Sequence, residues 1–237
     1  MAIATGRADG ETTTASSFKN ADRVQVSLVT AAEKRVLTWL AAHMPAWVGS
    51  DHLTLLGFAA QIMVGVSYAL SRYHRQWLLW GILFLAVNWF GDSLDGTLAR
   101  FRNRQRPRYG FYVDHVIDAA GSTVLMVGLA LSGYMTPLVA MALLVAFLLL
   151  AIEVYLATYT TGSFHLSFFN LGPTEVRIIL AIGNVALYIR GPWSHIAGHR
   201  FLLFDVGAVA AIVGMVIMFL YAAIGHSVQL YREERLP

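Results

Sequence analysis

The sequence predicts an all-α integral membrane protein: six transmembrane helices preceded by an amphipathic helix at the membrane interface. Of its 237 residues, 57% are hydrophobic and 13% are charged, whereas soluble domains have about 45–50% and about 25%. Its mean hydropathy is +0.59. A soluble globule of this length could not bury so much apolar surface, and a disordered chain would be more polar. The absence of cysteine excludes disulfides, thiol nucleophiles and Cys-ligated zinc.

The first segments are a tail and an interfacial helix. Residues 1–24 are small and polar, without the apolar core of a secretory signal, and we expect a disordered tail. Residues 25–237 are expected to form a single membrane domain. From Val26 to His43 apolar and charged positions alternate with helical spacing until Pro45, which predicts a helix lying in the membrane interface over about 26–43.

Apolar stretches predict the six spans, over about 52–230. Leu53–Ser71 has no formal charge for 19 residues, enough to cross the hydrocarbon core. The 34 uncharged residues of 119–152 are too long for one span, and the turn sequence Gly133–Pro137 divides them into two. The remaining spans are expected at 76–91, 178–189 and 206–225.

The basic residues predict the orientation. Thirteen of the 17 Lys and Arg residues fall on one predicted side, among them the five arginines from Arg100 to Arg108. The other four are Arg72, Arg75, Arg190 and Arg200. Because positive residues favour the cytoplasmic side, we expect both termini and the arginine-rich loop there. The expected location is the cytoplasmic membrane of a bacterium or archaeon.

Four carboxylates are spaced as two helical pairs. Asp92 and Asp95 are three residues apart at the end of the second span, and Asp114 and Asp118 are four apart at the start of the third. Each spacing places a pair on one helix face, and the short loop 101–110 makes the two helices neighbours. The four side chains can therefore converge near the cytoplasmic surface.

Carboxylates in an apolar background need a counter-charge. Two divalent cations would cancel the formal charge of the four aspartates, and ligands that are all oxygen favour Mg²⁺ or Mn²⁺, although Ca²⁺ also fits. Two alternatives stay open from the residues alone. The aspartates could pair with Arg100 and Arg102, or they could form the path of a cation transporter, which would predict inverted repeats that the sequence lacks.

The residues around the aspartates narrow the choice. Gly96, Ala99 and Gly110 remove side-chain bulk beside the carboxylates, and Arg100 offers a donor fork suited to phosphate. This stretch resembles the CDP-alcohol phosphotransferase family, whose pattern is D-x2-D-G-x2-A-R, eight or nine residues, then G-x3-D-x3-D. All eight positions of the pattern are present, at Asp92, Asp95, Gly96, Ala99, Arg100, Gly110, Asp114 and Asp118.

The resemblance implies a reaction and roles for these residues. A phospho-alcohol would pass from a CDP-linked donor to a second alcohol, with release of CMP. Two metals would be held by Asp92, Asp95, Asp114 and Asp118, and the donor would lie against Gly96, Ala99, Arg100 and Gly110. Thr54 resembles a family position near the nucleotide, although the usual Pro-Asn before it is Asp51-His52 here. Asp118 is the family's usual base, and homodimers are common in the family.

A second resemblance concerns the proton acceptor. Asp114-His115 and the run Gly172-Pro173-Thr174-Glu175 are similar to the choline/ethanolamine phosphotransferase branch, which implies that His115 and Glu175 form the proton-accepting pair. The same run also predicts a helix start, with Thr174 as the cap and Glu175 in the first turn. Capping alone is the alternative role of Glu175.

These patterns predict a metal-dependent enzyme of phospholipid synthesis that transfers a phospho-alcohol from a CDP-ethanolamine or CDP-choline type of donor to a diacylglycerol-like hydroxyl. The alternative has CDP-diacylglycerol as donor and glycerol phosphate, inositol phosphate or serine as acceptor, with Arg177 and the arginines of 102–108 available for a phosphorylated acceptor. A cation transporter is the distant alternative. The expected partners are the donor, the acceptor and membrane lipid, and no nucleic acid.

Overall fold

The computed structural model describes residues 30–161, 172–196 and 198–234. The elements in chain order are the helices α1 (Thr30–His43), α2 (Ser50–Ser71), α3 (Trp77–Phe101), α4 (Pro107–Ser132), α5 (Pro137–Thr161) and α6 (Pro173–Arg190), the strands β1 (Trp193–Ile196) and β2 (His199–Leu202), and the helix α7 (Leu203–Glu233). The predicted tail over 1–24 and the start of the predicted interfacial helix, residues 26–29, lie outside the described residues.

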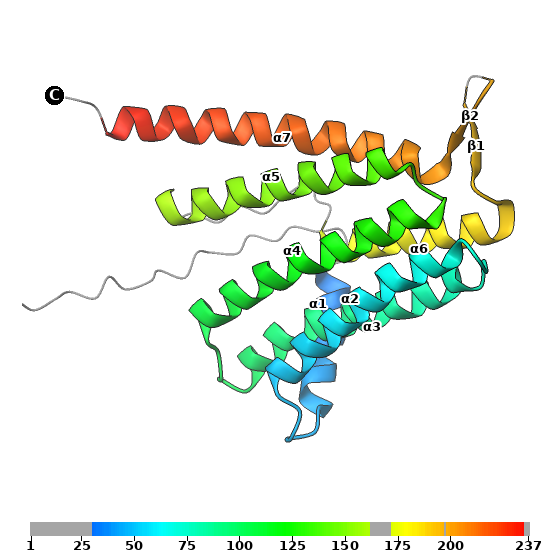
Figure 1. Ribbon diagram of the computed structural model, residues 1–237. Helices are drawn as coiled ribbons and strands as arrows, with labels where there is room; N and C mark the ends of the chain where they lie inside the picture. The colour runs from blue at the N-terminus through cyan, green and yellow to red at the C-terminus, as the bar shows by residue number, and fades with distance from the viewer. Residues whose placement is uncertain (1–29, 162–171, 197, 235–237) are drawn as a thin grey trace, which may run out of the picture.

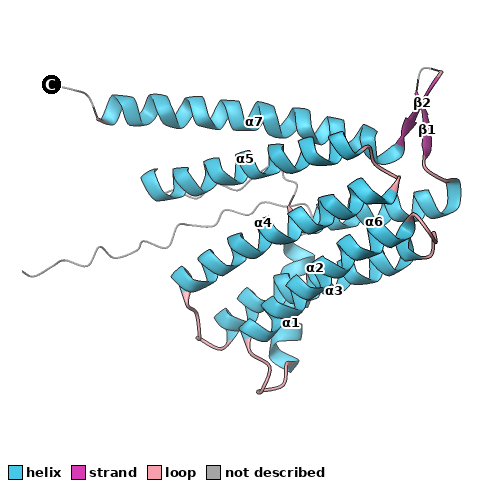
Figure 2. Cartoon of the chain, in the orientation of Figure 1, coloured by secondary structure: helices cyan, strands magenta, loops and turns pink. Residues whose placement is uncertain are grey.

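The long helices run between two ends of the molecule (Figures 1 and 2). We call the end that carries the α3–α4 loop, residues 102–106, and the C-terminus of α7 the aspartate end. The opposite end, which we call the hairpin end, carries the α2–α3 loop, residues 72–76, the α4–α5 turn, residues 133–136, and the strands. α1 packs on α3, which also contacts α6, while α2 packs between α3 and α4, and α5 lies between α4 and α7.

Five of the described helices are long and apolar enough to cross a membrane: α2, α3, α4, α5 and α7. The prediction of six spans is therefore not confirmed. The predicted span 178–189 falls in α6, which has 18 residues and carries three ionisable groups, Glu175, Arg177 and Arg190. The two-helix reading of 119–152 is confirmed, because α4 ends at Gly133, whose φ of 77° suits glycine, and α5 starts at Pro137.

The all-α prediction missed one element. β1 and β2 form a two-stranded antiparallel hairpin between α6 and α7, with Trp193 opposite Leu202 and Ile196 opposite His199. A pair of four-residue strands carries too short an alternating pattern to stand out beside spans of about 20 apolar residues. The hairpin turns the chain back from the end of α6 into α7.

Two apolar clusters hold the helices together. The larger lies towards the hairpin end and includes Val64, Leu78, Leu129 and Leu187, all at most 1% exposed. Inside it, the Tyr68 hydroxyl donates to Asn184 Oδ1 over 2.9 Å, which satisfies two polar groups that burial would otherwise penalise. The smaller cluster joins α1 to α2 and α3 at the aspartate end through Leu37, Ala41, Leu53, Leu94 and Leu98.

Two glycines set the closest approach of α2 to α3. A Cβ on Gly91 would lie 2.5 Å from the backbone nitrogen of Gly57 and 2.6 Å from the carbonyl oxygen of Leu53, closer than any side chain can come. Asn88, one turn earlier on α3, donates from Nδ2 to the Gly57 carbonyl over 2.9 Å. The backbones of the two helices are therefore nearly in contact at Gly91, the residue directly before Asp92.

Candidate active site

Asp92 is paired with an arginine from another helix. α3 continues to Phe101, so Asp92 and Asp95 lie within the helix rather than at its end. Arg177 Nη2, on α6, donates to Asp92 Oδ2 over 2.5 Å, and Arg177 Nε donates to Asn88 Oδ1 over 2.7 Å. The Arg177 side chain is only 15% exposed, and its Nη1 is buried with no hydrogen-bond partner among the described residues. A buried guanidinium with an unused donor atom faces the aspartate region.

Asp95 is the most buried of the four aspartates, at 7% exposure. The Thr54 hydroxyl, on α2, donates to its Oδ2 over 2.6 Å, and the backbone N–H of Gly96 donates to its Oδ1. The Ser50 hydroxyl donates to the Asp95 carbonyl oxygen over 3.2 Å. The start of α2 therefore orients this carboxylate, and Thr54 contacts a proposed metal ligand directly.

The second pair lies on α4 together with His115. Asp114 is half-buried and Asp118 is exposed. His115 Nδ1 lies 2.5 Å from the Phe111 carbonyl; because a carbonyl can only accept, this nitrogen carries the proton. The imidazole stacks on the Phe111 ring at 4.1 Å between centroids and meets the Tyr155 ring edge-on at 4.5 Å. Aromatic rings from α4 and α5 thus fix the orientation of His115.

The two pairs interact across the α3–α4 boundary. The negative charges of Asp92 and Asp114 both act on Asp95, while the convergence of all four aspartates stays a prediction. Among the described residues, however, no three His, Asp or Glu side chains lie close enough to hold one ion.

The small residues of the motif have different surroundings. At Gly96 an added Cβ would lie 3.4 Å from Arg100 Nη1, so the Arg100 guanidinium covers this backbone. At Gly110 nothing lies within 4 Å of an added Cβ. Ala99 is half-buried on the same helix, and Arg100 Nη2 donates to the Thr97 hydroxyl over 3.2 Å. The missing bulk at Gly110 leaves open space and is not required by packing within the described residues.

Two arginines of the 102–108 segment serve the fold. Arg102 donates to three carbonyl oxygens between α1 and α2, at Val48, Met44 and Pro45. Arg106 donates to Asp51, and this carboxylate raises the pKa of Arg106 above its usual value. These contacts hold the α3–α4 loop against the segment before α2 and the first turn of α2. The arginines that remain for binding a phosphate are therefore mainly Arg100, Arg104, Arg108 and Arg177.

Glu175 caps α6. Its Oε2 accepts the backbone N–H of Gly172 over 2.9 Å, and Gly172, not Thr174, is the N-cap residue. The prediction that Thr174 caps the helix is wrong, because its hydroxyl donates instead to Glu33 on α1 over 2.6 Å. The capping role of Glu175 is thus confirmed; its pairing with His115 stays a prediction.

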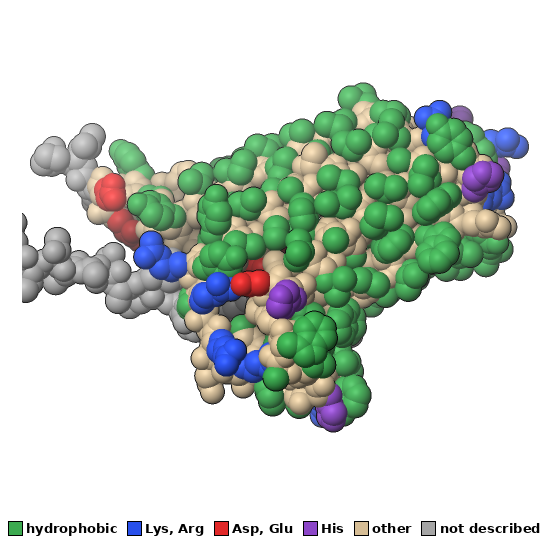
Figure 3. All heavy atoms as spheres, turned by 60° about the horizontal axis from the view of Figure 1, so that its bottom comes forward, with side chains coloured by type: hydrophobic (Ala, Val, Ile, Leu, Met, Phe, Trp, Pro, Cys, Tyr) green, Lys and Arg blue, Asp and Glu red, His purple; other side chains and the backbone are tan. Residues whose placement is uncertain are grey.

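Three partners escaped the sequence reasoning. Asn88 precedes Asp92 by four residues inside an apolar span, a spacing that could have marked it. Glu33 on α1 accepts from Trp89 Nε1 over 2.7 Å as well as from Thr174. Glu153 on α5 lies 2.6 Å from His226 on α7, a pairing that no local pattern predicts because 73 residues separate them. Figure 3 shows acidic, His and basic side chains gathered beside a hollow on an otherwise mainly apolar face.

Comparison with known proteins gives one family and three relatives. A family model described as CDP-alcohol phosphatidyltransferase matches residues 47–225. The archaetidylinositol phosphate synthase of Methanothermobacter thermautotrophicus is 27% identical over 150 residues, which cover 61% of this chain and 70% of the relative. The phosphatidylinositol phosphate synthase of Streptomyces avermitilis is 35% identical over 41% of this chain and 38% of its own.

The archaetidylinositol phosphate synthase of Pyrococcus horikoshii is 32% identical over 35% of this chain and 41% of its own. The matches to the Streptomyces and Pyrococcus proteins thus span less than half of those proteins. All three relatives are named as inositol phosphate lipid synthases, and none as a choline or ethanolamine phosphotransferase. The predicted similarity to the choline/ethanolamine branch is therefore not confirmed, and the alternative donor and acceptor are favoured.

Proposed function

Because the chain belongs to the CDP-alcohol phosphatidyltransferase family, we propose that it transfers a phosphatidyl-type group from a CDP-linked lipid to a phosphorylated polyol such as inositol phosphate, releasing CMP. Family membership makes it a multi-pass membrane transferase of phospholipid biosynthesis. The names of the three relatives support an inositol phosphate acceptor. This is the alternative reading of the sequence, in which the lipid is the donor.

The observation that carries the proposal is the buried guanidinium of Arg177. A phosphorylated acceptor brings about two negative charges to a site that already holds four aspartates, so it needs a cation nearby. Arg177 reaches the site from α6 and keeps Nη1 unbonded and buried, which is costly unless a ligand uses it. An uncharged acceptor hydroxyl, as on diacylglycerol, gives no use to this donor atom.

The donor set fits divalent cations, which the family uses. The carboxylates of Asp92, Asp95, Asp114 and Asp118 are hard oxygen ligands, and four carboxylates in an apolar background call for a counter-charge. We assign two Mg²⁺ or Mn²⁺ ions to these four residues. When bound, the ions would neutralise the diphosphate and stabilise charge on the leaving CMP.

The remaining residues bind the substrates and accept the proton of the acceptor hydroxyl. Gly96, Ala99 and Gly110 admit the nucleotide and its phosphates, Arg100 pairs with a phosphate, and Thr54 orients Asp95. The acceptor hydroxyl attacks the phosphorus that carries the lipid, and the bond from that phosphorus to the CMP oxygen breaks. The hydroxyl proton passes to Asp118, which is the exposed carboxylate of α4.

The reaction is assigned to the cytoplasmic side. The aspartate end carries the arginine-rich loop, and the hairpin end carries Arg72, Arg75, Arg190 and Arg200. The larger share of positive residues favours the aspartate end as cytoplasmic. The smaller cluster with Leu37 seats α1 against α2 and α3 at that end, where its exposed Trp39 suits the lipid interface.

The test is a CMP-release assay on the purified full chain with Mg²⁺ or Mn²⁺. CDP-diacylglycerol with inositol phosphate is expected to release CMP, and replacement by free inositol should lower the rate strongly. CDP-ethanolamine or CDP-choline with diacylglycerol should release none. Release only from the aminoalcohol donors would overturn the proposal and return His115 and Glu175 to the centre of the mechanism.

A further inference from the structure

A polar cavity lies at the hairpin end, remote from the aspartates. It measures about 510 Å³ and is lined by Tyr73, His74, Arg75, Gln76 and Tyr188. Ligand pockets commonly measure about 300–1,000 Å³. The lining comes from the α2–α3 loop and from the last turns of α6, elements that take no part in the aspartate site. We propose that this cavity binds the phosphate of an anionic phospholipid from the leaflet at the hairpin end.

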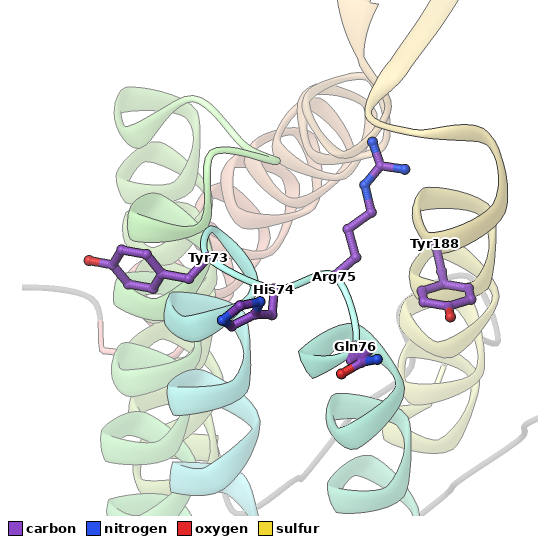
Figure 4. A pocket seen from close by; sticks show the side chains of 5 residues that line it. All are labelled: Tyr73, His74, Arg75, Gln76 and Tyr188. Carbon is purple, nitrogen blue, oxygen red and sulfur yellow. The ribbon is translucent and has the colours of Figure 1, made fainter.

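The arrangement of the side chains presents donors to one opening. Arg75 extends from the loop towards the end of α6, where an added Cβ on Gly191 would lie 3.9 Å from its Nη2. Tyr188 faces the same opening from α6 and Gln76 lies below it, whereas Tyr73 points to the other side of the loop (Figure 4). A guanidinium, an amide and a phenol around one opening are the donors that a phosphate oxygen needs.

These donors are unused inside the described part of the chain. Arg75, His74, Gln76 and Tyr188 make no side-chain hydrogen bond or ion pair with another described residue. The segments that meet at the hairpin end, residues 71–77, 132–137 and 190–205, contain one acidic residue, Asp205. Asp205 already accepts two hydrogen bonds from Thr136, at 2.8 and 2.5 Å. The local positive charge therefore has no counterpart among these segments.

The position of the cavity relative to the membrane favours a lipid as its ligand. Arg75 lies between the ends of α2 and α3, both apolar enough to cross a membrane, so the loop sits at headgroup depth. Two of the lining residues are exposed aromatics, Tyr73 at 69% and Tyr188 at 39% exposure, as in the aromatic belt of membrane interfaces. At headgroup depth, the phosphates available to these donors are those of lipid headgroups.

Native mass spectrometry of the full chain in a neutral detergent tests the assignment. Short-chain phosphatidylglycerol, phosphatidylcholine and inorganic phosphate are titrated separately. Arg75→Gln should weaken phosphatidylglycerol binding about fivefold, and Tyr188→Phe should weaken it less. Arg200→Gln, which removes an exposed charge at the same end but outside the cavity, should leave binding unchanged. Because the Arg75 side chain makes no hydrogen bond or ion pair with another described residue, its variant should keep the wild-type thermal unfolding temperature.

Three results would overturn the assignment. Equal losses in the Arg75 and Arg200 variants would show diffuse attraction to the positive end and no pocket. Equal binding of phosphatidylcholine would remove the selectivity for an anionic lipid. Saturable binding of inorganic phosphate that Arg75→Gln abolishes, without lipid binding, would make the cavity a free-phosphate site. Repeating the titration in the Asp95→Asn background separates this cavity from the aspartate site. A lipid bound at the aspartate site should not depend on Arg75, whereas a lipid bound in the cavity should.

Discussion

Arg177 on α6 and Asp92 on α3 are joined by a hydrogen-bonded ion pair of 2.5 Å, which is largely shielded from solvent on the arginine side. Asn88 holds the same guanidinium through its Nε. The pair neutralises one aspartate of the motif and leaves the Arg177 Nη1 atom unbonded. The functional consequences of this contact and of the helix packing behind it can be measured.

Replacement of Arg177 should impair the use of a phosphorylated acceptor. In Arg177→Gln the site loses the charged donor, and we expect the KM for inositol phosphate to rise about 10–100-fold, with a smaller effect on the KM for CDP-diacylglycerol. Steady-state CMP release measures both. The matched control is Arg190→Gln at the opposite end of α6, which should retain wild-type constants. An unchanged acceptor KM in Arg177→Gln would remove Arg177 from acceptor binding.

Replacement of the aspartates should remove metal-dependent turnover. Asp95→Asn keeps the volume and can still accept from Thr54, but it loses the charge that a cation needs, so CMP release should fall below detection. Asp114→Asn should behave likewise. Excess EDTA should abolish the activity of the wild type, and Mn²⁺ should restore it. Bound Mn²⁺, counted by electron paramagnetic resonance, should decrease in both variants; full Mn²⁺ binding in either would contradict the ligand assignment.

The proton acceptor can be assigned by paired variants on α4. We expect Asp118→Asn to lower kcat about 10²–10⁴-fold, the contribution usual for general base catalysis. His115→Asn should keep kcat within about tenfold of wild type, because we assign the base to Asp118 and the His115 ring lies between the Phe111 and Tyr155 rings. A larger loss of kcat in His115→Asn than in Asp118→Asn would identify His115 as the general base. Circular dichroism checks that both variants fold.

The close contact of α2 with α3 predicts an unusual cost for a small substitution. Gly91→Ala places a methyl group against the backbone of Gly57, so it should destabilise the protein by about 1–3 kcal/mol, and it should lower activity by moving Thr54 away from Asp95. The control Gly207→Ala on α7 meets nothing within 4 Å and should be neutral or slightly stabilising. Denaturant unfolding in mixed micelles measures both. Equal stabilities would argue against the packing described.

The fifth prediction concerns the hydrogen bonds by which Glu33 holds α1 against α3 and α6. Glu33→Ala removes the acceptor shared by Trp89 and Thr174, and we expect a loss of about 1–3 kcal/mol in the same unfolding assay. Glu33→Gln keeps an accepting oxygen and should recover most of the stability. Lys34→Ala, at the exposed neighbouring position, controls for the loss of a side chain from α1. A similar loss in all three variants would exclude a specific role for the Glu33 carboxylate.

Much of the fold could be predicted from the sequence because a membrane span requires a continuous run of apolar residues. A run of about 20 apolar residues is long enough to span the hydrocarbon core, so Leu53–Ser71 and the division at Gly133 could be located from the order of residues alone. α6 was harder, because Glu175 and Arg177 at its start and Arg190 at its end leave an uncharged run that is short for a span. The β1–β2 hairpin was missed because four-residue strands carry too little periodicity.

The sequence by itself determined the motif and its helix faces: Asp92 and Asp95 are spaced to share one face, and so are Asp114 and Asp118. Only the tertiary structure decided which partners they meet. Arg177 is 85 residues from Asp92, Thr54 is 41 from Asp95, and Glu33 is 141 from Thr174. Helical periodicity acts over three or four residues, whereas these contacts depend on how whole helices pack, which no local pattern encodes.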